Sequence, residues 1–228
     1  MRPWQHAVSS AGTENRPWDD DLDIHEFLDM TKVCCADRRH RLALHSVDLG
    51  AELAARAFPD RPDARAIAVR HVVEDLGRPA SVADWVAGCD PLRLPLPLQR
   101  RLVVGKAGVV ELVVNRLDPA CRPAVSEVYD LLTLPVTFVP HRPELGYAVL
   151  MNSFGPALAR RLLGRPRAIT HEHGEIVLDY GWIAEALTFA MFGRIVDLGE
   201  VARACMREPF ADQAEKEGHF ANRADRIP

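Results

Sequence analysis

Histidines and carboxylates in the first third of the chain are the residues best suited to chemistry. Asp37 and His40 are three positions apart, and His71 lies three and four positions before Glu74 and Asp75. Residues at these spacings share one face of a helix. Two facing helices that each carry a carboxylate–imidazole pair are the arrangement found in carboxylate-bridged metal bundles. The sequence therefore predicts one site made by Asp37, His40, His71, Glu74 and Asp75.

This predicted site has three interpretations. Mixed nitrogen and oxygen ligands suit a divalent metal such as Fe, Mn, Zn or Ni, which would act as a Lewis acid or lower the pKa of a bound water. In a site without metal, His40 or His71 would be the general base, oriented by a neighbouring carboxylate. A structural interpretation competes with both, because Asp37, Arg41 and His45 have the four-residue spacing of a salt-bridge ladder on a helix.

Predicted helices position these residues. An N-cap at Asp23, apolar residues at nearly heptad spacing and a proline stop predict one long helix over 24–58. Shorter helices are expected over 67–76 and 81–86, the first ended by a glycine and the second capped by a serine. The N-terminal part is therefore expected to be a helical module with one long helix and two shorter ones.

The long helix sets limits on the other histidines. On an unbroken helix His25 and His40 are about 22 Å apart, so one ion cannot bind both. His45 points about 140° away from His40 around the same axis. His25, Asp29 and His45 are therefore expected around the site or in another one.

A proline-rich connector is predicted to divide the chain. Three prolines within 91–101 disfavour helix there. The expected organisation is a His/Asp-rich helical module over 1–90, this connector, an α+β domain over 102–207 and a polar tail over 208–228. Residues 1–22 are expected to be an irregular arm. The predicted fold class is α+β.

Within the later domain, short hairpins and helices are expected. The hairpins pair 136–139 with 147–151 and 168–170 with 175–180, and the helices cover 123–132, 153–163, 182–192 and 198–206. The tip of the second hairpin carries His171 and His173 on one face of a strand. This pair fits either a metal or phosphate site or an exposed polar turn.

Composition excludes several classes of protein. The chain has 228 residues, 48% hydrophobic and 26% charged, which excludes a wholly disordered protein. The net charge of −4 argues against a nucleic-acid binder that works by bulk charge. No secretory signal and no apolar run of about eighteen residues is present, so no membrane association is expected. A small-molecule ligand and a homo-oligomer both remain compatible with the sequence.

The cysteines indicate a compartment. There are five of them, an odd number, without CxxC spacing. This pattern favours reduced thiols in a cytoplasm over a disulfide framework or a structural zinc site.

Residues 6–86 resemble a small bacterial and phage-borne domain family of unknown function. The resemblance rests on an early His-Ala, an Ile-His stretch, an Asp-x-Arg-His-Arg stretch with a later His, and a His-Val-x-Glu-Asp-x-Gly-Arg stretch followed by Asp-Trp. These are His6-Ala7; Ile24-His25 with Phe27, Asp29, Thr31 and Lys32; Asp37 with Arg39-His40-Arg41 and His45; His71-Val72 with Glu74-Asp75 and Gly77-Arg78; and Asp84-Trp85. The segment between the two helices is shorter than in the family, and Pro79-Ala80 stands where the family has Ile-Pro. The resemblance implies a helical module with a polar His/Asp cluster and implies no activity.

Two classes of function follow from these observations. The first is a cytoplasmic enzyme whose site is the cluster of His40 and His71, with or without a divalent metal. The second is a non-catalytic binding or regulatory protein, associated with mobile elements or defence, in which the cluster is structural. Phosphate-loop, dinucleotide-binding and nucleophile-elbow motifs are absent.

Overall fold

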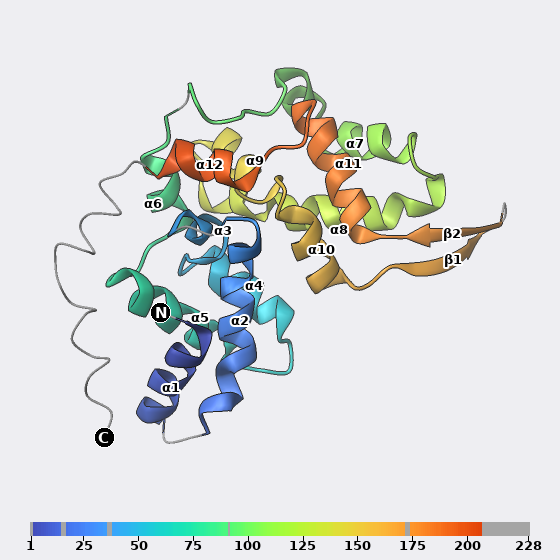
Figure 1. The fold of residues 1–228 in the computed structure, drawn as a ribbon. Coiled ribbons are helices and arrows are strands. Elements are labelled where there is room, and N and C mark those ends of the chain that lie inside the picture. Colours follow the sequence, from blue (N-terminus) through green and yellow to red (C-terminus); the bar gives the residue numbers. More distant parts are fainter. Residues whose placement is uncertain (1, 15–16, 36–37, 91, 172–173, 207–228) are drawn as a thin grey trace.

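The computed structural model describes residues 2–14, 17–35, 38–90, 92–171 and 174–206. Helices make up most of this part, and two strands pair antiparallel, which confirms the α+β class. Helices of the N-terminal half gather on one side of the molecule, while the hairpin extends outward on the other side (Figure 1).

Four helices of the N-terminal half pack around one another. They are α1 (Pro3–Glu14), α2 (Leu22–Asp29), α4 (Leu49–Ala57) and α5 (Ala64–Leu76). α2 contacts the other three, and α5 contacts α1 and α4. Ile24, Leu28, Leu53 and Ile67 are fully buried between them. The apolar faces of these helices therefore form one core, from which the site residues project.

α1 occupies the segment that the sequence predicted to be irregular, so that prediction is wrong. Pro3 begins the helix, where its fixed φ and missing N–H are tolerated. His6, Ala7 and Ser10, at helical spacing, are completely buried, and α1 packs on α2 and α5. Two of these three buried residues are polar, so an apolar pattern does not reveal this face.

The predicted long helix over 24–58 is also wrong. The chain instead forms α2, 3-10 turns at Met30–Val33 and Arg38–His40, α3 (Arg41–Leu44) and α4. Before α4, the Asp48 side chain accepts a hydrogen bond from the Leu49 N–H, and Ser46 Oγ accepts one from the Gly50 N–H. Such side-chain bonds to the backbone compete with the helical ladder. The chain therefore turns where the apolar spacing predicted one continuous helix.

Two predicted helix signals in this half are confirmed. Gly77 ends α5 in the left-handed conformation, with φ 69°. Ser81 and Asp84 form a reciprocal capping box at the start of α6 (Val82–Ala87). Residues 92–98 contain no helix, as the prolines predicted. The division into a module and a separate domain stays a prediction, and the predicted tail over 208–228 lies outside the described residues.

The C-terminal half is built on α11 (Tyr180–Phe192), which packs against three other helices. These are α7 (Gln99–Val114), α8 (Arg122–Thr133) and α10 (Gly155–Leu163). α7 is kinked at Gly105, whose φ of 61° suits a residue without Cβ. The helices expected over 123–132, 153–163 and 182–192 are thus present. None of the described helices is both long enough and apolar enough to cross a bilayer.

Of the two predicted hairpins, one is wrong and one is confirmed. Residues 134–138 form a 3-10 turn and Pro143–Leu150 forms α9, because prolines near the start of each segment suit a helical first turn. The second hairpin joins β1 (Arg167–His171) to β2 (Gly174–Leu178), with Ile169 opposite Ile176.

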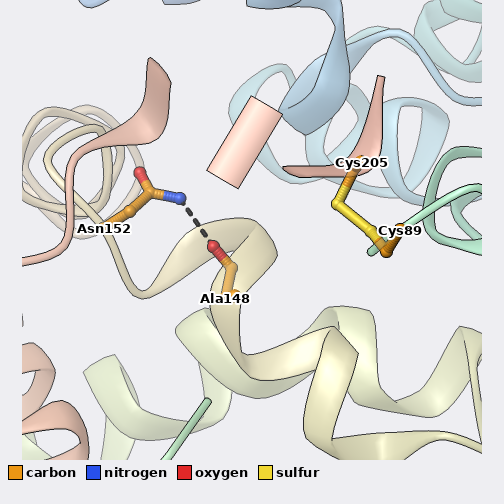
Figure 2. The surroundings of a disulfide bond; sticks show 4 residues. All are labelled: Cys89, Ala148, Asn152 and Cys205. Atoms are coloured by element: carbon orange, nitrogen blue, oxygen red, sulfur yellow. Dashed lines mark hydrogen bonds between the residues drawn. A yellow bond between two sulfur atoms is a disulfide. The ribbon is translucent and has the colours of Figure 1, made fainter. Parts of the chain in front are cut away.

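The last described helix, α12 (Leu198–Cys205), returns to the N-terminal half. It contacts α6, α9 and the 3-10 turn at Arg38–His40. Cys205 at its end forms a disulfide with Cys89 (Figure 2). In the same view the Asn152 side chain donates a hydrogen bond to the Ala148 carbonyl and ends α9. The prediction of five reduced thiols is therefore wrong for this pair, because folding brings together cysteines that are far apart in the sequence.

A candidate metal centre

Seven histidine and aspartate side chains from four segments of the chain meet in the N-terminal half. α1 supplies His6, α2 supplies one histidine and one aspartate, the segment from the 3-10 turn to the end of α3 supplies two histidines, and α5 supplies the last two. The set is His6, His25, Asp29, His40, His45, His71 and Asp75. Each is at most 5% exposed. Burial of so many ionisable groups requires that they satisfy one another or bind an ion.

The first part of this set is the three-histidine group, made by His6, His25 and His71. One ligand nitrogen of each lies within 4.8 Å of the others. His25 Nδ1 is 2.9 Å from His71 Nδ1. Two of these rings also contact residues outside the group. His6 Nδ1 is 2.8 Å from Glu74 Oε2, and His25 Nε2 is 3.4 Å from Ser10 Oγ.

The second part is the mixed group, made by Asp29, His40, His45 and Asp75, whose ligand atoms also lie within 4.8 Å of one another. Asp29 Oδ1 is 3.7 Å from His40 Nε2, 3.6 Å from His45 Nε2 and 4.0 Å from His71 Nε2. Among the described residues, this buried oxygen makes no hydrogen bond. Three imidazole nitrogens thus surround one carboxylate oxygen just beyond hydrogen-bonding distance.

His71 and Asp75 connect the two groups. His71 presents Nδ1 to His25 and places Nε2 3.0 Å from His45 Nε2. Asp75 Oδ1 is 3.0 Å from His6 Nε2, while Oδ2 is 3.3 Å from His45 Nε2. Because these residues are four apart on α5, they share the helix face that points into the cluster.

Burial keeps two of the histidines neutral. It lowers the pKa of His25 to about 4, and the neighbouring His6 adds to this effect. Burial also holds the pKa of His71 well below its ordinary value, with His45 and His6 acting in the same direction. Neutral imidazole is the form that binds a metal ion. Both residues are therefore in the ligating state at neutral pH.

The carboxylates of the mixed group are ionised. Burial alone would raise the pKa of Asp29, but His45 and Lys32 bring it below the ordinary value. Burial opposes ionisation of Asp75 as well, but His45, His6 and the Arg41 charge hold its pKa far below the usual range. Burial would lower the pKa of His6, but the carboxylates of Asp75 and Glu74 outweigh it, so the pKa is raised.

Two cationic side chains border the mixed group. Lys32 Nζ contacts Asp29 Oδ2, and its side chain is 37% exposed. Arg41 lies 3.2 Å from Asp75 Oδ2 and is 17% exposed. The His40 side chain alone is 7% exposed, and its Nε2 lies 3.7 Å from Asp29 Oδ1. Lys32 and Arg41 therefore reach solvent beside the mixed group, and we call this its open side.

The structure brings together four of the five predicted site residues. His71 and His40 both approach Asp29 Oδ1. Asp75 joins both groups, and Glu74 contacts the cluster through His6. The fifth predicted residue, Asp37, lies outside the described residues.

The sequence argument placed His25, Asp29 and His45 outside the site, and this was wrong. It rested on an unbroken helix, and the turns after α2 allow the chain to double back. His6 was missed because its segment was predicted to be irregular. The signal that could have found all four is the family motif, whose polar positions include each of them. Of the hairpin pair, His173 lies outside the described residues, and the hairpin extends away from α1, α2 and α5 (Figure 1).

Comparison with known families agrees with the resemblance seen in the motif. Residues 1–93 match the model of a domain of unknown function (DUF6915). No curated protein and no solved structure matches the chain. Every residue of the cluster falls within the matched segment, so the cluster is a feature of that domain's part of the chain.

Proposed function

We propose that residues 1–93 form a metal-dependent hydrolytic module, in which the mixed group binds a divalent cation. The observation that carries this proposal is the position of Asp29 Oδ1, which faces three imidazole nitrogens at 3.6–4.0 Å without a hydrogen bond to the described residues. Metal–ligand bonds of about 2.1 Å hold neighbouring ligand atoms about 3.0–3.5 Å apart. Small inward movements of these side chains therefore suffice for coordination.

The ligand types support a transition metal. Two histidines and two aspartates offer mixed nitrogen and oxygen ligands, which suit Zn, Fe, Mn or Ni better than Mg or Ca. The ionised carboxylates supply the charge that a dication needs. In this proposal His40 is a ligand instead of a general base, and Lys32 and Arg41 border the open side.

A bound cation would supply the nucleophile. It lowers the pKa of a coordinated water so that hydroxide forms near neutral pH, with the proton released to solvent. Asp29, His40, His45 and Asp75 would hold the ion, and the hydroxide chemistry that it would supply suits hydrolysis of an ester. The open side of the mixed group is where such a substrate would reach the ion.

Metal binding and hydrolysis are tested separately. Chelator-treated protein is titrated with Zn²⁺ or Mn²⁺ by calorimetry, and Asp29→Asn and His45→Ala are each expected to weaken binding at least about tenfold. The matched control is His141→Ala, which removes an exposed histidine outside the cluster. Absence of binding in the folded wild type would overturn the proposal and leave the cluster as a structural network.

The catalytic part has its own readout. The metal-loaded wild type is expected to hydrolyse p-nitrophenyl acetate or bis(p-nitrophenyl) phosphate faster than the metal alone does. The Asp29→Asn variant is expected to show no hydrolysis above that of the metal alone. Tight metal binding without any rate above the metal blank would refute the enzyme and favour the non-catalytic, regulatory alternative.

A further inference from the structure

We infer that the three-histidine group binds a second divalent transition-metal ion, and that Asp75 bridges it to the ion of the mixed group. The inference rests on the proposed function, because the bridge requires an ion in the mixed group. It adds a second site with its own ligands, His6, His25 and His71, and makes the centre dinuclear.

The first argument is how each imidazole is oriented. His6 turns Nδ1 to Glu74 and His25 turns Nε2 to Ser10, and each has its other nitrogen inside the group. His71 places Nε2 toward His45 and Asp29, which leaves Nδ1 inside. A metal-binding histidine almost always gives its second N–H to a carboxylate or another acceptor, which fixes the ring and its tautomer. His6 and His25 fit this pattern, with Glu74 and Ser10 as their outer partners.

The second argument is the buried nitrogen of His6. Its Nε2 makes no hydrogen bond to the described residues, although it lies 3.0 Å from Asp75 Oδ1. His6 is fully buried, and its ring centroid is 4.1 Å from that of His71. An unsatisfied buried nitrogen is costly. A cation between His6 and the other two rings would satisfy it and use the carboxylate oxygen beside it.

The third argument is the position of Asp75. Its Oδ1 lies beside the three-histidine group and its Oδ2 beside His45 of the mixed group. A carboxylate with one oxygen at each of two ligand sets is the geometry of a bridging ligand. Three imidazoles and a carboxylate oxygen suit Zn, Fe, Ni or Mn.

Stoichiometry tests this inference. Native mass spectrometry of full-length protein loaded with Mn²⁺ or Zn²⁺ is expected to show two ions in the wild type and in the His141→Ala control. His6→Ala is expected to keep one ion, and Asp29→Asn is also expected to keep one. His6→Gln, which fills more of the space, serves as a second variant, and circular dichroism checks that each protein is folded.

The outcomes separate the two proposals. A single wild-type ion that persists in His6→Ala and disappears in Asp29→Asn would overturn the second site and leave the proposed function intact. A single ion with the opposite pattern would overturn the proposed function and the bridge together. A wild type without ions would overturn both.

A spectroscopic measurement tests the bridge directly. Two Mn²⁺ ions joined by one carboxylate are magnetically coupled, so the electron paramagnetic resonance spectrum of the loaded wild type is expected to differ from that of isolated Mn²⁺. Asp75→Asn is expected to reduce the coupling. A spectrum of isolated Mn²⁺ in a protein with two ions would exclude Asp75 as a bridge.

Discussion

At the scale of residues, the cluster holds buried carboxylates whose negative charge must be compensated. Asp29 contacts Lys32, and Asp75 contacts Arg41, while the carboxylate of Glu74 faces His6. Taking a carboxylate out of water costs several kcal/mol even after relaxation. Three carboxylates thus lie close together beside the neutral imidazoles of His25 and His71. A cation placed among these groups would balance that charge, which is why we favour metal binding over a network of hydrogen bonds alone.

Glu74 is expected to affect metal binding through its contact with His6. We expect Glu74→Gln to weaken metal binding about 10- to 100-fold, because the amide no longer holds the His6 ring as a carboxylate does. The measurement is the dissociation constant for Mn²⁺ or Zn²⁺ in calorimetry. The mutation leaves both proposed ligand sets in place, so the number of ions should not change at saturating metal.

Glu52→Gln is the matched control for this change. Glu52 lies on α4 in surface ion pairs with Arg56 and Arg65, away from the cluster. Its variant should bind metal as the wild type does. Equal affinity in Glu74→Gln and Glu52→Gln would show that Glu74 does not orient a metal ligand.

At the scale of elements, the turn between α3 and α4 depends on a close backbone approach. A Cβ added at Gly50 would lie 2.1 Å from the Leu44 carbonyl oxygen. We expect Gly50→Ala to destabilise the protein by about 1–3 kcal/mol, as overpacking does. Urea unfolding followed by circular dichroism measures the change. His45 ends α3, so metal affinity should fall as well.

Gly12→Ala is the control, because the same substitution is made where there is room. No described atom lies within 4 Å of a Cβ added at Gly12 in α1, and alanine is the better helix former by up to about 1 kcal/mol. This variant should be as stable as the wild type or slightly more so. Equal losses at both positions would contradict the close approach at Gly50.

The elements that the sequence predicted well have strong local signals. Each of these signals involves residues close together in the sequence. The structure has the α6 cap at Ser81 and Asp84 and the end of α5 at Gly77, as expected. The β1–β2 hairpin follows the alternation of its residues. By contrast, the turn between α3 and α4 is held by a contact between distant segments, the hydrogen bond from the Val47 N–H to the Ala80 carbonyl.

The difference between local and long-range signals also explains which site residues could be predicted from the sequence. His40, His71, Glu74 and Asp75 were predicted because helical spacing pairs each histidine with a carboxylate. His6 has no such neighbour in the sequence, and its partners are 68 and 69 positions away on α5. Long-range partners of this kind cannot be inferred from periodicity. They became visible only through the motif shared with a family.

At the scale of the whole molecule, a bound metal should stabilise the fold. The ligands come from α1, α2, α5 and the segment around α3, so an ion that binds only the folded state links all of them. At a free metal concentration of 100 times the dissociation constant, the expected gain is about 2.7 kcal/mol. Thermal unfolding with metal and with chelator measures this shift.

Asp29→Asn should lose part of the shift, because it is expected to keep only the ion of the three-histidine group, whereas His141→Ala should keep all of it. Unfolding curves that are the same with metal and with chelator, at concentrations that give binding in calorimetry, would show that the ion does not favour the folded state. That result would contradict a centre built from residues of four separate segments.

The disulfide joins the segment after α6 to the end of α12. Cys89 follows α6 and Cys205 ends α12, with 116 positions between them. The contact is reinforced by a hydrogen bond from the Asp90 N–H to the Ala204 carbonyl. A cross-link that closes so long a loop restricts the unfolded chain strongly, and its removal typically costs about 2–5 kcal/mol. The α6–α12 contact should therefore depend on the oxidation state of this pair.

We accordingly expect the paired variant Cys89→Ser/Cys205→Ser to unfold at lower denaturant concentration than the oxidised wild type, by about 2–5 kcal/mol. Adding reductant should remove the difference, because it opens the same bond in the wild type. Cys34→Ser is the control: it leaves the pair intact and should keep the response to reductant.

Thiol titration of denatured wild type should give three groups before reduction and five after it. Five groups before reduction, in protein purified without reductant, would show that Cys89 and Cys205 are not joined and that α12 is held to α6 by packing alone.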